Sequence, residues 1–469
     1  MNTNLDTIAA IATPIGSGAV GIIKISGPLA ISSSFSIFHP KNKKIKSIKD
    51  IKSHKMYLGH IVNPINNNFI DEVLFVAMNG PYSYTGEDVV EINTHGGGIV
   101  LQTILEIILA NNNNIRLAEP GEFTKRAFLK GRIDLTKAEA IIDIISSKTT
   151  KSLELASNQL SGNLLERVEF IRTSILKILS MIEAEIDFPE EVEMDNEEIF
   201  PQMQKIQNLL EELLNKYDQG RIFRQGARLV IVGRPNVGKS SLMNRLLEKQ
   251  RSIVTAIPGT TRDIVEESIN ILGMPIILTD TAGIHETDDP VESIGINFTK
   301  ERLSNADLVI FIIDASSQIT EDDEKIFNQI QNKKTIIAIN KIDLLKEEQD
   351  KIISFNDWPD TDDNWKISKI KISALYGTGI KNLKKTIYES LIGNITNSPD
   401  LAPNLRHKIA LTKALKSINS AIDALDNNME PDLIAIDIKL ALGALGEIVG
   451  HTFTEDLLDE IFGRFCIGK

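Results

Sequence analysis

The sequence predicts a multidomain α/β protein in which an α/β domain is inserted into an all-α helical domain, after an N-terminal α+β domain. Strand-like apolar runs dominate residues 1–120, and helical periodicity fills residues 121–218 and 391–469. Between the helical stretches, over residues 219–390, strands alternate with helices as in a parallel sheet. Because helical segments flank the alternating segment, we expect a domain insertion, which is tolerated where the ends of the inserted domain lie close together.

The N-terminal α+β domain is expected to contain several strands and a long helix. Its apolar runs are separated by glycine and proline turns, which is typical of strands joined by short loops. The expected strands cover residues 20–25, 72–77 and 89–93, and the expected helix covers residues 99–110.

The helical domain is predicted from apolar residues that recur with helical spacing. Helices are expected over residues 138–145, 164–186 and 203–214, and again in the tail from about residue 403. Phe188-Pro189 should end the second of these helices, because proline lacks a backbone N–H and disfavours helix at the residue before it.

The inserted domain contains the phosphate-binding loop pattern G-x-x-x-x-G-K-[ST], as Gly233-Arg234-Pro235-Asn236-Val237-Gly238-Lys239-Ser240. The loop follows an apolar run and precedes a helical run, so its context is strand–loop–helix. Its glycines allow backbone N–H groups to surround phosphate oxygens near the positive end of the helix. Lys239 is expected to reach the β- and γ-phosphates and Ser240 to bind Mg²⁺, with Val237, Gly238 and Ser241 beside them.

Three further motifs predict that the nucleotide is GTP. Asp280-Thr281-Ala282-Gly283 follows an apolar run, where a carboxylate supports Mg²⁺ and a glycine N–H meets the γ-phosphate. The second motif is Asn340-Lys341-Ile342-Asp343, whose Asp343 carboxylate can accept two hydrogen bonds from guanine that adenine does not offer. The third motif, Ser373-Ala374-Leu375, closes the base pocket. The inserted domain is therefore predicted to be a Ras-like P-loop GTPase domain. The residues expected at the base are Asn340, Lys341, Asp343, Ser373, Ala374 and Leu375.

Composition places the chain among cytoplasmic proteins that do not span a membrane. At 469 residues it is expected to form two to four domains, with 42% apolar and 25% charged residues. No apolar run approaches the roughly 20 residues of a membrane span, and the first residues do not resemble a secretory signal. A single cysteine, Cys466, fits a reducing compartment.

The net charge of −13 disfavours nucleic-acid binding over the whole surface, so any RNA contact must be local. Residues 41–55 are the exception, with seven lysines against one aspartate. Two interpretations of this segment stay open, namely a solvated loop and an RNA contact.

Several motifs together resemble the tRNA modification GTPase family MnmE, also called TrmE, over essentially the whole chain. The N-terminal segments and the last five residues separate this family from other translation-related GTPases. The segments that carry the resemblance are Ala12-Thr13-Pro14, Gly21 to Gly27, Tyr84-Thr85-Gly86-Glu87-Asp88, His95-Gly96-Gly97, Pro120 to Thr124, Ala138-Glu139-Ala140, Ile186 to Pro189, Pro258 to Asp263, and Phe465-Cys466-Ile467-Gly468-Lys469.

The resemblance implies a tRNA-modifying enzyme. Family members act with an FAD- and NADH-using partner of the MnmG type, expected as a heterotetramer, on C5 of the wobble uridine of certain tRNAs. The product carries an aminomethyl or carboxymethylaminomethyl group. The one-carbon unit comes from 5-formyl- or methylene-tetrahydrofolate, bound by a folate-binding-like N-terminal domain that forms a homodimer. GTP hydrolysis drives the two nucleotide domains together and apart.

The resemblance also implies how GTP is hydrolysed. Ile284 stands where Ras-like proteins have a water-orienting glutamine, so other groups must supply that role. The family places K⁺ near Asn236 and the loop containing Thr255, Ile257 and Thr260, with Ala256, Pro258 and Gly259 beside the nucleotide. Thr261 joins Ser240 on Mg²⁺, and Glu292 orients the attacking water. From the residues alone, Asn236 could instead stabilise its loop, and Glu292 could be a solvated acid.

For the folate, the resemblance implies that Glu91 binds the pterin edge and that Arg132 and Lys469 face anionic groups. Lys24 stands where the family commonly has arginine. A lysine there keeps the positive charge but cannot donate two parallel hydrogen bonds as arginine does. Each of these residues has an ordinary surface or strand interpretation as well. Cys466 is a candidate nucleophile, and an equally open interpretation is packing.

Two other functions are compatible with the motifs. One is a regulatory GTPase that acts in ribosome or RNA assembly without modification chemistry. The other is a folate-binding switch whose GTPase senses one-carbon supply.

Overall fold

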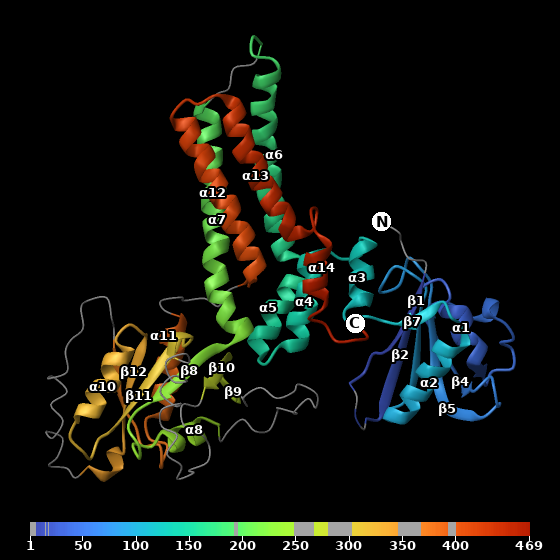
Figure 1. Cartoon of the computed structure of the whole chain (residues 1–469), viewed down its shortest axis with the longest axis horizontal. Coiled ribbons are helices and arrows are strands. Elements are labelled where there is room, and N and C mark those ends of the chain that lie inside the picture. The colour runs from blue at the N-terminus through green and yellow to red at the C-terminus, as the bar shows by residue number, and fades with distance from the viewer. Residues whose placement is uncertain are drawn as a thin grey trace. The chain divides into compact units, whose positions relative to one another are not determined.

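The computed structural model describes residues 6–14, 16, 18–191, 196–247, 267–279, 303–345, 367–392 and 400–469. These residues form two compact units (Figure 1). The first unit comprises Met1–Ile142, Leu160–Gln207 and Lys413–Lys469, and the second comprises Asp143–Gln159 and Asn208–Thr412. Among the described residues, no helix has the length and apolarity that crossing a membrane requires.

The first unit contains a mixed sheet with the strand order β3-β4-β5-β6-β2-β1-β7. Neighbouring strands are antiparallel, except that β1 pairs parallel with β7. The three strands expected from the sequence are confirmed as β2, β5 and β6. The strands are β1 Thr7–Ile11, β2 Val20–Ser26, β3 Phe38–Pro40, β4 Lys55–Val62, β5 Phe69–Met78, β6 Val89–His95 and β7 Ile115–Leu117.

One face of this sheet carries the core of the N-terminal domain. Alternate strand residues such as Ile23, Phe75 and Ile92 are fully buried there, as the two-residue period of a strand requires. They pack against helices α1 (Ala30–Ile37) and α2 (Gly98–Asn111), the second of which confirms the expected helix. The lysine-bearing face of β2 lies on the other side of the sheet.

The chain's last residues lie beside β1. A Cβ on Gly468, at φ +97°, would overlap the Ile11 carbonyl oxygen and lie 2.9 Å from the Ala12 Cα. On the face of the sheet that carries Lys24, Phe123 of α3 (Glu122–Leu129) is fully buried against Ile8 and Ala10. The C-terminal segment therefore adjoins the sheet of the N-terminal domain.

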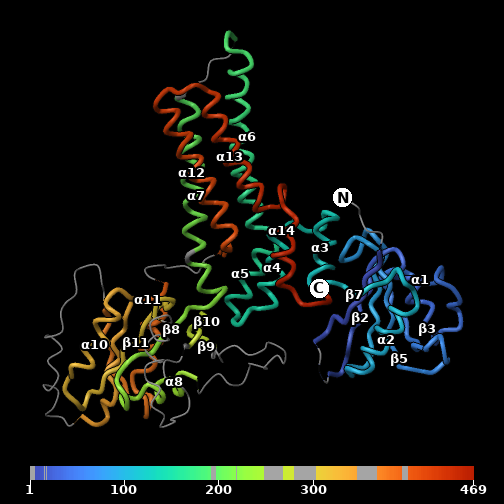
Figure 2. Tube along the Cα trace, in the orientation of Figure 1, coloured from blue at the N-terminus to red at the C-terminus, as the bar shows by residue number. Residues whose placement is uncertain are grey.

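The remainder of the first unit is helical, as predicted. Figure 2 shows α6 (Asn163–Asp187) and α13 (Pro431–Val449) running side by side although they are far apart in the sequence. Helix α6 ends before Phe188-Pro189, where a break was expected. Helix α14 (Glu455–Phe462) packs against α3. Four further helices each contain residues of both units. They are α4 Leu135–Ser146, α5 Thr150–Leu160, α7 Asn196–Gln225 and α12 Leu405–Asp426.

The second unit contains a sheet with the order β13-β12-β11-β8-β10-β9, all parallel except β9. Its central strands are buried on both faces, which explains their continuous apolar runs. Thus the predicted Ras-like P-loop domain is confirmed as a fold. The elements are β8 Ala227–Val232, α8 Lys239–Leu247, β9 Glu267–Ile271, β10 Met274–Thr279, β11 Leu308–Asp314, α10 Glu321–Ile330, β12 Thr335–Asn340, β13 Ser368–Lys371 and α11 Ile380–Ile392.

The domain limits expected from the sequence remain a proposal. They are residues 1–120, 121–218, 219–390 and 391–469.

Candidate functional site

The phosphate-binding loop joins the end of β8 to the start of α8. Asn236 at φ +63° and Gly238 at φ +104° lie in the left-handed region, which glycine and asparagine tolerate best. The Lys239 Nζ donates hydrogen bonds to the carbonyl oxygens of Gly233, at 2.8 Å, and Arg234, at 2.7 Å. The lysine thus arches over the loop, with its charge placed where phosphates would enter.

Side chains in the first turn of α8 are available to a metal ion and phosphates. Ser240 and Ser241 are exposed, as is Asn236 in the loop. This turn contains no acidic residue, so the positive end of the helix is not neutralised from within.

Asn340, at the end of β12, joins the phosphate loop to the loop that contains Ser373, Ala374 and Leu375, which is the predicted base-binding loop. Only 2% of this residue is exposed. Its Nδ2 donates to the Val237 carbonyl oxygen at 2.8 Å, and its Oδ1 accepts from the Ala374 N–H at 2.9 Å. A Cβ on Gly238 would overlap the Asn340 Nδ2, so only glycine lets the asparagine approach. The two halves of the predicted nucleotide site are therefore assembled by one buried amide.

The base-binding loop is also held from α8. Arg245 Nε donates to the Ala374 carbonyl oxygen at 3.1 Å, and the guanidinium also donates to the Leu375 carbonyl oxygen. Within the loop, the Gly377 N–H donates to the Ser373 carbonyl oxygen at 2.7 Å. Arg245 thus forms a second link between the loop and the helix that starts at the phosphate site.

Lys341 and Asp343 lie beside the base-binding loop. Lys341 adopts φ +64°, and its Nζ lies 2.7 Å from the Asp314 Oδ2. Burial opposes ionisation of Asp314, but hydrogen bonds from Lys341 and Ser316 outweigh it and hold the pKa of this carboxyl below its usual value. Asp343 is exposed and available for a ligand.

A second cluster of predicted residues lies on the N-terminal sheet of the first unit. Lys24 on β2 is directly opposite Glu91 on β6, with 3.9 Å between the charged atoms. The Lys24 Nζ also lies 5.2 Å from the ring centre of Tyr84 and 5.5 Å from that of Phe123. Burial lowers the pKa of Lys24, Glu91 counteracts this, and the nearby Lys469 adds to the lowering.

Arg132, in the turn after α3, lies against the loop that carries Tyr84. Its guanidinium donates to the Pro81 carbonyl oxygen at 3.4 Å, and a Cβ on Gly86 would lie 3.4 Å from the Arg132 Cγ. Lys24, Glu91 and Lys469 are thus brought together, with Arg132 on the adjoining loop. A carboxylate, three cations and an aromatic wall suit a ligand that has an amide-like edge and anionic groups. Cys466 is exposed on the C-terminal segment.

Comparison with known proteins identifies the family. The model described as "GTP-binding protein TrmE N-terminus" matches residues 7–132, and the model described as "MnmE helical domain" matches residues 135–466.

The chain belongs to the MnmE family.

Relatives named "tRNA modification GTPase MnmE" match along their whole length. The relative from Carboxydothermus hydrogenoformans is 46% identical over 468 residues, and the one from Clostridioides difficile is 48% identical over 473 residues. Each alignment covers 99% of this chain and 99% of the relative. A crystal structure of Aquifex aeolicus Era bound to GDP·AlF4⁻ is 33% identical, covers 40% of this chain and 66% of that chain, and has a TM-score of 0.28.

Part of the expected MnmE-family nucleotide site lies outside the described residues. These positions are Thr255, Ala256, Ile257, Pro258, Gly259, Thr260, Thr261, Asp280, Thr281, Ala282, Gly283 and Glu292.

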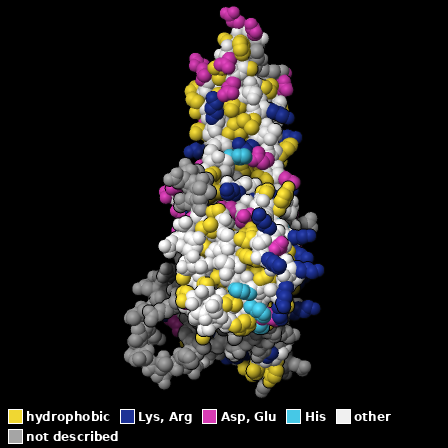
Figure 3. All heavy atoms as spheres, turned by 90° about the vertical axis from the view of Figure 1, so that its right-hand side faces the viewer, with side chains coloured by type: hydrophobic (Ala, Val, Ile, Leu, Met, Phe, Trp, Pro, Cys, Tyr) yellow, Lys and Arg dark blue, Asp and Glu magenta, His cyan; other side chains and the backbone are white. Residues whose placement is uncertain are grey.

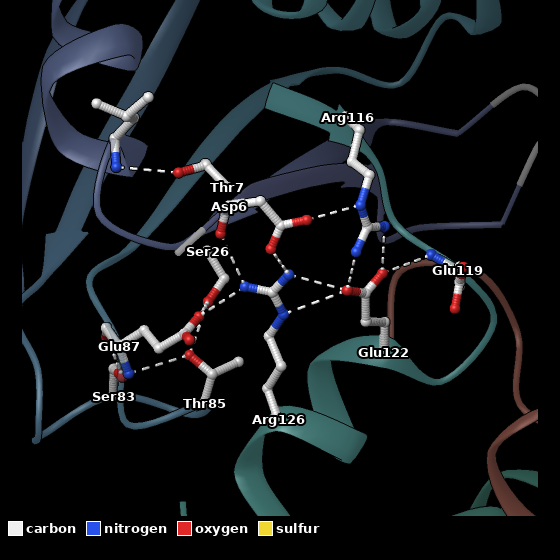
Figure 4. A network of polar contacts seen from close by, with 11 residues as sticks. Asp6, Thr7, Ser26, Ser83, Thr85, Glu87, Arg116, Glu119, Glu122 and Arg126 are labelled. Carbon is white, nitrogen blue, oxygen red and sulfur yellow. Dashed lines mark hydrogen bonds and ion pairs between the residues drawn. The ribbon is translucent and has the colours of Figure 1, made fainter. Parts of the chain in front are cut away.

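In this MnmE-family chain, an ion network around the largely buried Arg126, which the sequence did not predict, supports the N-terminal cluster (Figure 4). Arg126 on α3 bonds to Glu122 at 2.9 Å, to Glu87 at 3.2 Å and to Asp6 at 2.8 Å. Arg116 on β7 bonds to the same Glu122 at 2.6 Å. The network joins Asp6, directly before β1, with β7 and α3 to the loop of Glu87, on which Tyr84 lies.

Proposed function

We propose that this chain is a GTP-hydrolysing enzyme of tRNA modification. With an FAD- and NADH-using partner, it adds an aminomethyl or carboxymethylaminomethyl group at C5 of the wobble uridine. The observation that carries the proposal is the Asn340 bridge, which joins a phosphate loop to a guanine-binding loop in a chain whose relatives are named tRNA modification GTPases.

Hydrolysis is assigned to residues of the second unit. On GTP binding, the Lys239 ammonium exchanges the carbonyls of Gly233 and Arg234 for β- and γ-phosphate oxygens. Ser240 and Thr261 would hold Mg²⁺, which would neutralise charge between these phosphates. Glu292 orients the attacking water.

K⁺ is proposed as the additional cation at the phosphates. Asn236, Thr255, Ile257 and Thr260 would hold it through amide, hydroxyl and carbonyl oxygens. The exposed Asn236 side chain on a left-handed loop residue supports this role, because the amide remains available to a ligand.

The cluster around Lys24 is proposed as the one-carbon site. A tetrahydrofolate derivative, 5-formyl or methylene, supplies the one-carbon unit there. Glu91 accepts hydrogen bonds from the pterin edge, and Lys24, Arg132 and Lys469 bind anionic groups. Lys24 and Glu91 are 16% and 32% exposed at their side chains, so ligand atoms can reach both. We further propose a cytoplasmic homodimer that forms a heterotetramer with the partner.

Mass spectrometry of tRNA nucleosides from cells that lack this chain tests the function. We expect the modified wobble uridines to disappear and to return with the wild-type gene. Unchanged wobble uridines, together with defective ribosomal subunits, would support the regulatory GTPase instead.

The cation is tested by GTP hydrolysis in KCl and in NaCl at equal ionic strength. Wild-type protein should hydrolyse GTP faster in KCl, and Asn236→Ala should abolish the difference. Equal wild-type rates in the two salts would remove K⁺ from the proposal.

A further inference from the structure

Residues 41–55, called here the lysine segment, form a strongly basic surface on an acidic chain. The segment carries lysines at positions 41, 43, 44, 46, 49, 52 and 55 and one acidic residue, Asp50. All seven lysines are exposed. Residues 1–132 have 13 lysines and arginines against 10 aspartates and glutamates, although the whole chain has a net charge of −13. Figure 3 shows dark blue side chains gathered along one side of the face that it presents.

The lysine segment is anchored to the fold along its length. Ile45 is 9% exposed and belongs to the core of the N-terminal domain, with Ile51 packed against that core. The Lys41 N–H donates to the Leu58 carbonyl oxygen at 3.0 Å, and the Lys52 N–H donates to the Tyr57 hydroxyl at 2.8 Å. A solvated loop would not need these anchors, whereas an array that presents charge in a fixed arrangement would.

The lysines have few negative partners. The Asp50 carboxylate accepts the backbone N–H groups of Lys46 and Ser47, each at 2.9 Å, and these bonds hold its pKa below the usual value. Lys41 pairs with Glu72. Within the described residues, no ion pair forms at Lys43, Lys44, Lys49 or Lys52. Like charges held this close repel one another, so a partner with many negative charges would relieve the repulsion.

We propose that the lysine segment binds the phosphate backbone of the RNA substrate. The inference rests on the proposed function, which supplies tRNA as the polyanion. Successive phosphates of an RNA strand match an array of separate ammonium groups, each of which acts as a point charge without base preference. The segment thus positions the tRNA, and reading of the wobble base takes place elsewhere.

The shape of the segment favours RNA over an anionic membrane. Its helix, η1 (Ile48–Asp50), is a single short turn, and Ile45 and Ile51 are directed into the core. A membrane-surface segment instead presents an apolar face beside its basic face. Within the segment, Ile48 is the one exposed apolar side chain, at 40% exposure, so the segment offers charge without a continuous apolar face.

The test compares two variants that each lose three positive charges. Lys43→Gln/Lys44→Gln/Lys49→Gln changes the segment, and Lys325→Gln/Lys381→Gln/Lys385→Gln changes exposed lysines of the second unit. Binding of unmodified tRNA is measured by fluorescence anisotropy from about 50 to 200 mM NaCl at constant KCl. Each lost phosphate contact should reduce the slope of log affinity against log salt by about 0.7 to 0.9.

We expect the segment variant to lose two to three such contacts and about tenfold in affinity at low salt, and the control to bind like wild type. GTP hydrolysis and the circular dichroism spectrum should be equal in all three proteins, which shows that both units are folded in each. Equal tRNA affinity and slope in wild type and the segment variant would overturn the inference. Binding to phosphatidylserine vesicles that depends on the segment, without any effect on tRNA binding, would also overturn it. The proposed function is judged separately by the wobble nucleosides of cells lacking the chain.

Discussion

The nucleotide site of the second unit and the proposed one-carbon site of the first unit are built in different ways. The nucleotide site uses backbone geometry in one contiguous loop and a single buried amide, Asn340, that joins it to the base-binding loop. The one-carbon site uses side chains from distant parts of the chain, from Lys24 to Lys469, and an ion network behind them. One added carbon atom in the phosphate loop should therefore abolish nucleotide binding. Replacement of a single side chain in the proposed one-carbon site should instead weaken ligand binding only in part.

The largest effect is expected for Gly238→Ala. Its Cβ would overlap the Asn340 Nδ2 at a residue with φ +104°, so both the loop and the bridge must shift. We expect affinity for a fluorescent GDP analogue to fall by about 100-fold or more, which corresponds to about 3 kcal/mol. Gly443→Ala is the matched control, because a Cβ there meets nothing within 4 Å in a helix. Retained affinity in Gly238→Ala would show that the bridge is not needed.

The next largest effect is expected for Arg126→Ala in the ion network. Removal of the guanidinium takes away an ion-pair partner of Glu87 and of Glu122. The loss is costly because the Arg126 side chain is only 10% exposed, so water cannot readily replace it. The expected destabilisation is about 3 kcal/mol, measured as faster hydrogen exchange in α3 and β7. The exposed pair Arg464–Glu460 provides the control Arg464→Ala, which should change stability by less than about 0.5 kcal/mol.

The same network predicts acid sensitivity of the first unit. Burial alone would raise the pKa of Glu122, but hydrogen bonds from Arg116, the Glu119 N–H and Arg126 hold it below its usual value. A carboxyl with a lowered pKa stabilises the fold above its unfolded-state pKa, and this stability is lost as pH falls through the folded-state pKa. Protection of α3 should therefore decline below about pH 4, and it should decline less steeply in Glu122→Gln.

A smaller effect is expected for Arg245→Ala, because Asn340 still holds the base-binding loop. Loss of the bonds to Ala374 and Leu375 should weaken GDP binding by about tenfold, or about 1.4 kcal/mol. The ratio of GDP to inosine diphosphate affinity should stay constant, since the amino group that distinguishes them is assigned to Asp343. Arg245→Lys should restore part of the affinity. A changed ratio would place Arg245 in base selection rather than in loop positioning.

The smallest effect concerns the pH dependence of folate binding. The pKa of Lys24 is lowered by burial, so its positive charge is lost at a lower pH than that of an ordinary lysine. Affinity for 5-formyltetrahydrofolate should therefore fall a few-fold with rising pH, and this fall should begin at a lower pH than the titration of an ordinary lysine. Calorimetry on Lys24→Arg should show a flatter profile, because arginine keeps its charge throughout. Identical profiles would remove Lys24 from the site.

The sequence indicated the motifs of the proposed nucleotide site but not the residues that hold them in place. The phosphate loop and each base motif are short continuous segments, and each follows an apolar strand. Because the ends of parallel strands lie at one sheet edge, these positions indicate that the motifs meet there. The bonds of Arg245 to Ala374 and Leu375 could not be predicted from the sequence, because an arginine at that position of α8 is typical of the exposed face of an amphipathic helix.

The one-carbon cluster required tertiary information. The pairing of Lys24 with Glu91 depends on the register between β2 and β6, and the position of Lys469 depends on where the C-terminal segment ends. The partners of Arg126 are Asp6, directly before β1, Glu87 in its loop, and Glu122 in α3, and no local pattern joins them. Only the family resemblance indicated Lys24, Glu91, Arg132 and Lys469, and it did not indicate the network behind them.

The central claim is that a GTP site and a one-carbon site on one chain both serve wobble-uridine modification. The direct measurement is nucleoside mass spectrometry of tRNA from cells that lack the chain and carry wild type, Gly238→Ala, Glu91→Gln or Gly443→Ala at equal protein levels. We expect wild type and Gly443→Ala to restore the modified uridines, and Gly238→Ala and Glu91→Gln not to restore them. Full restoration by either Gly238→Ala or Glu91→Gln would contradict the account.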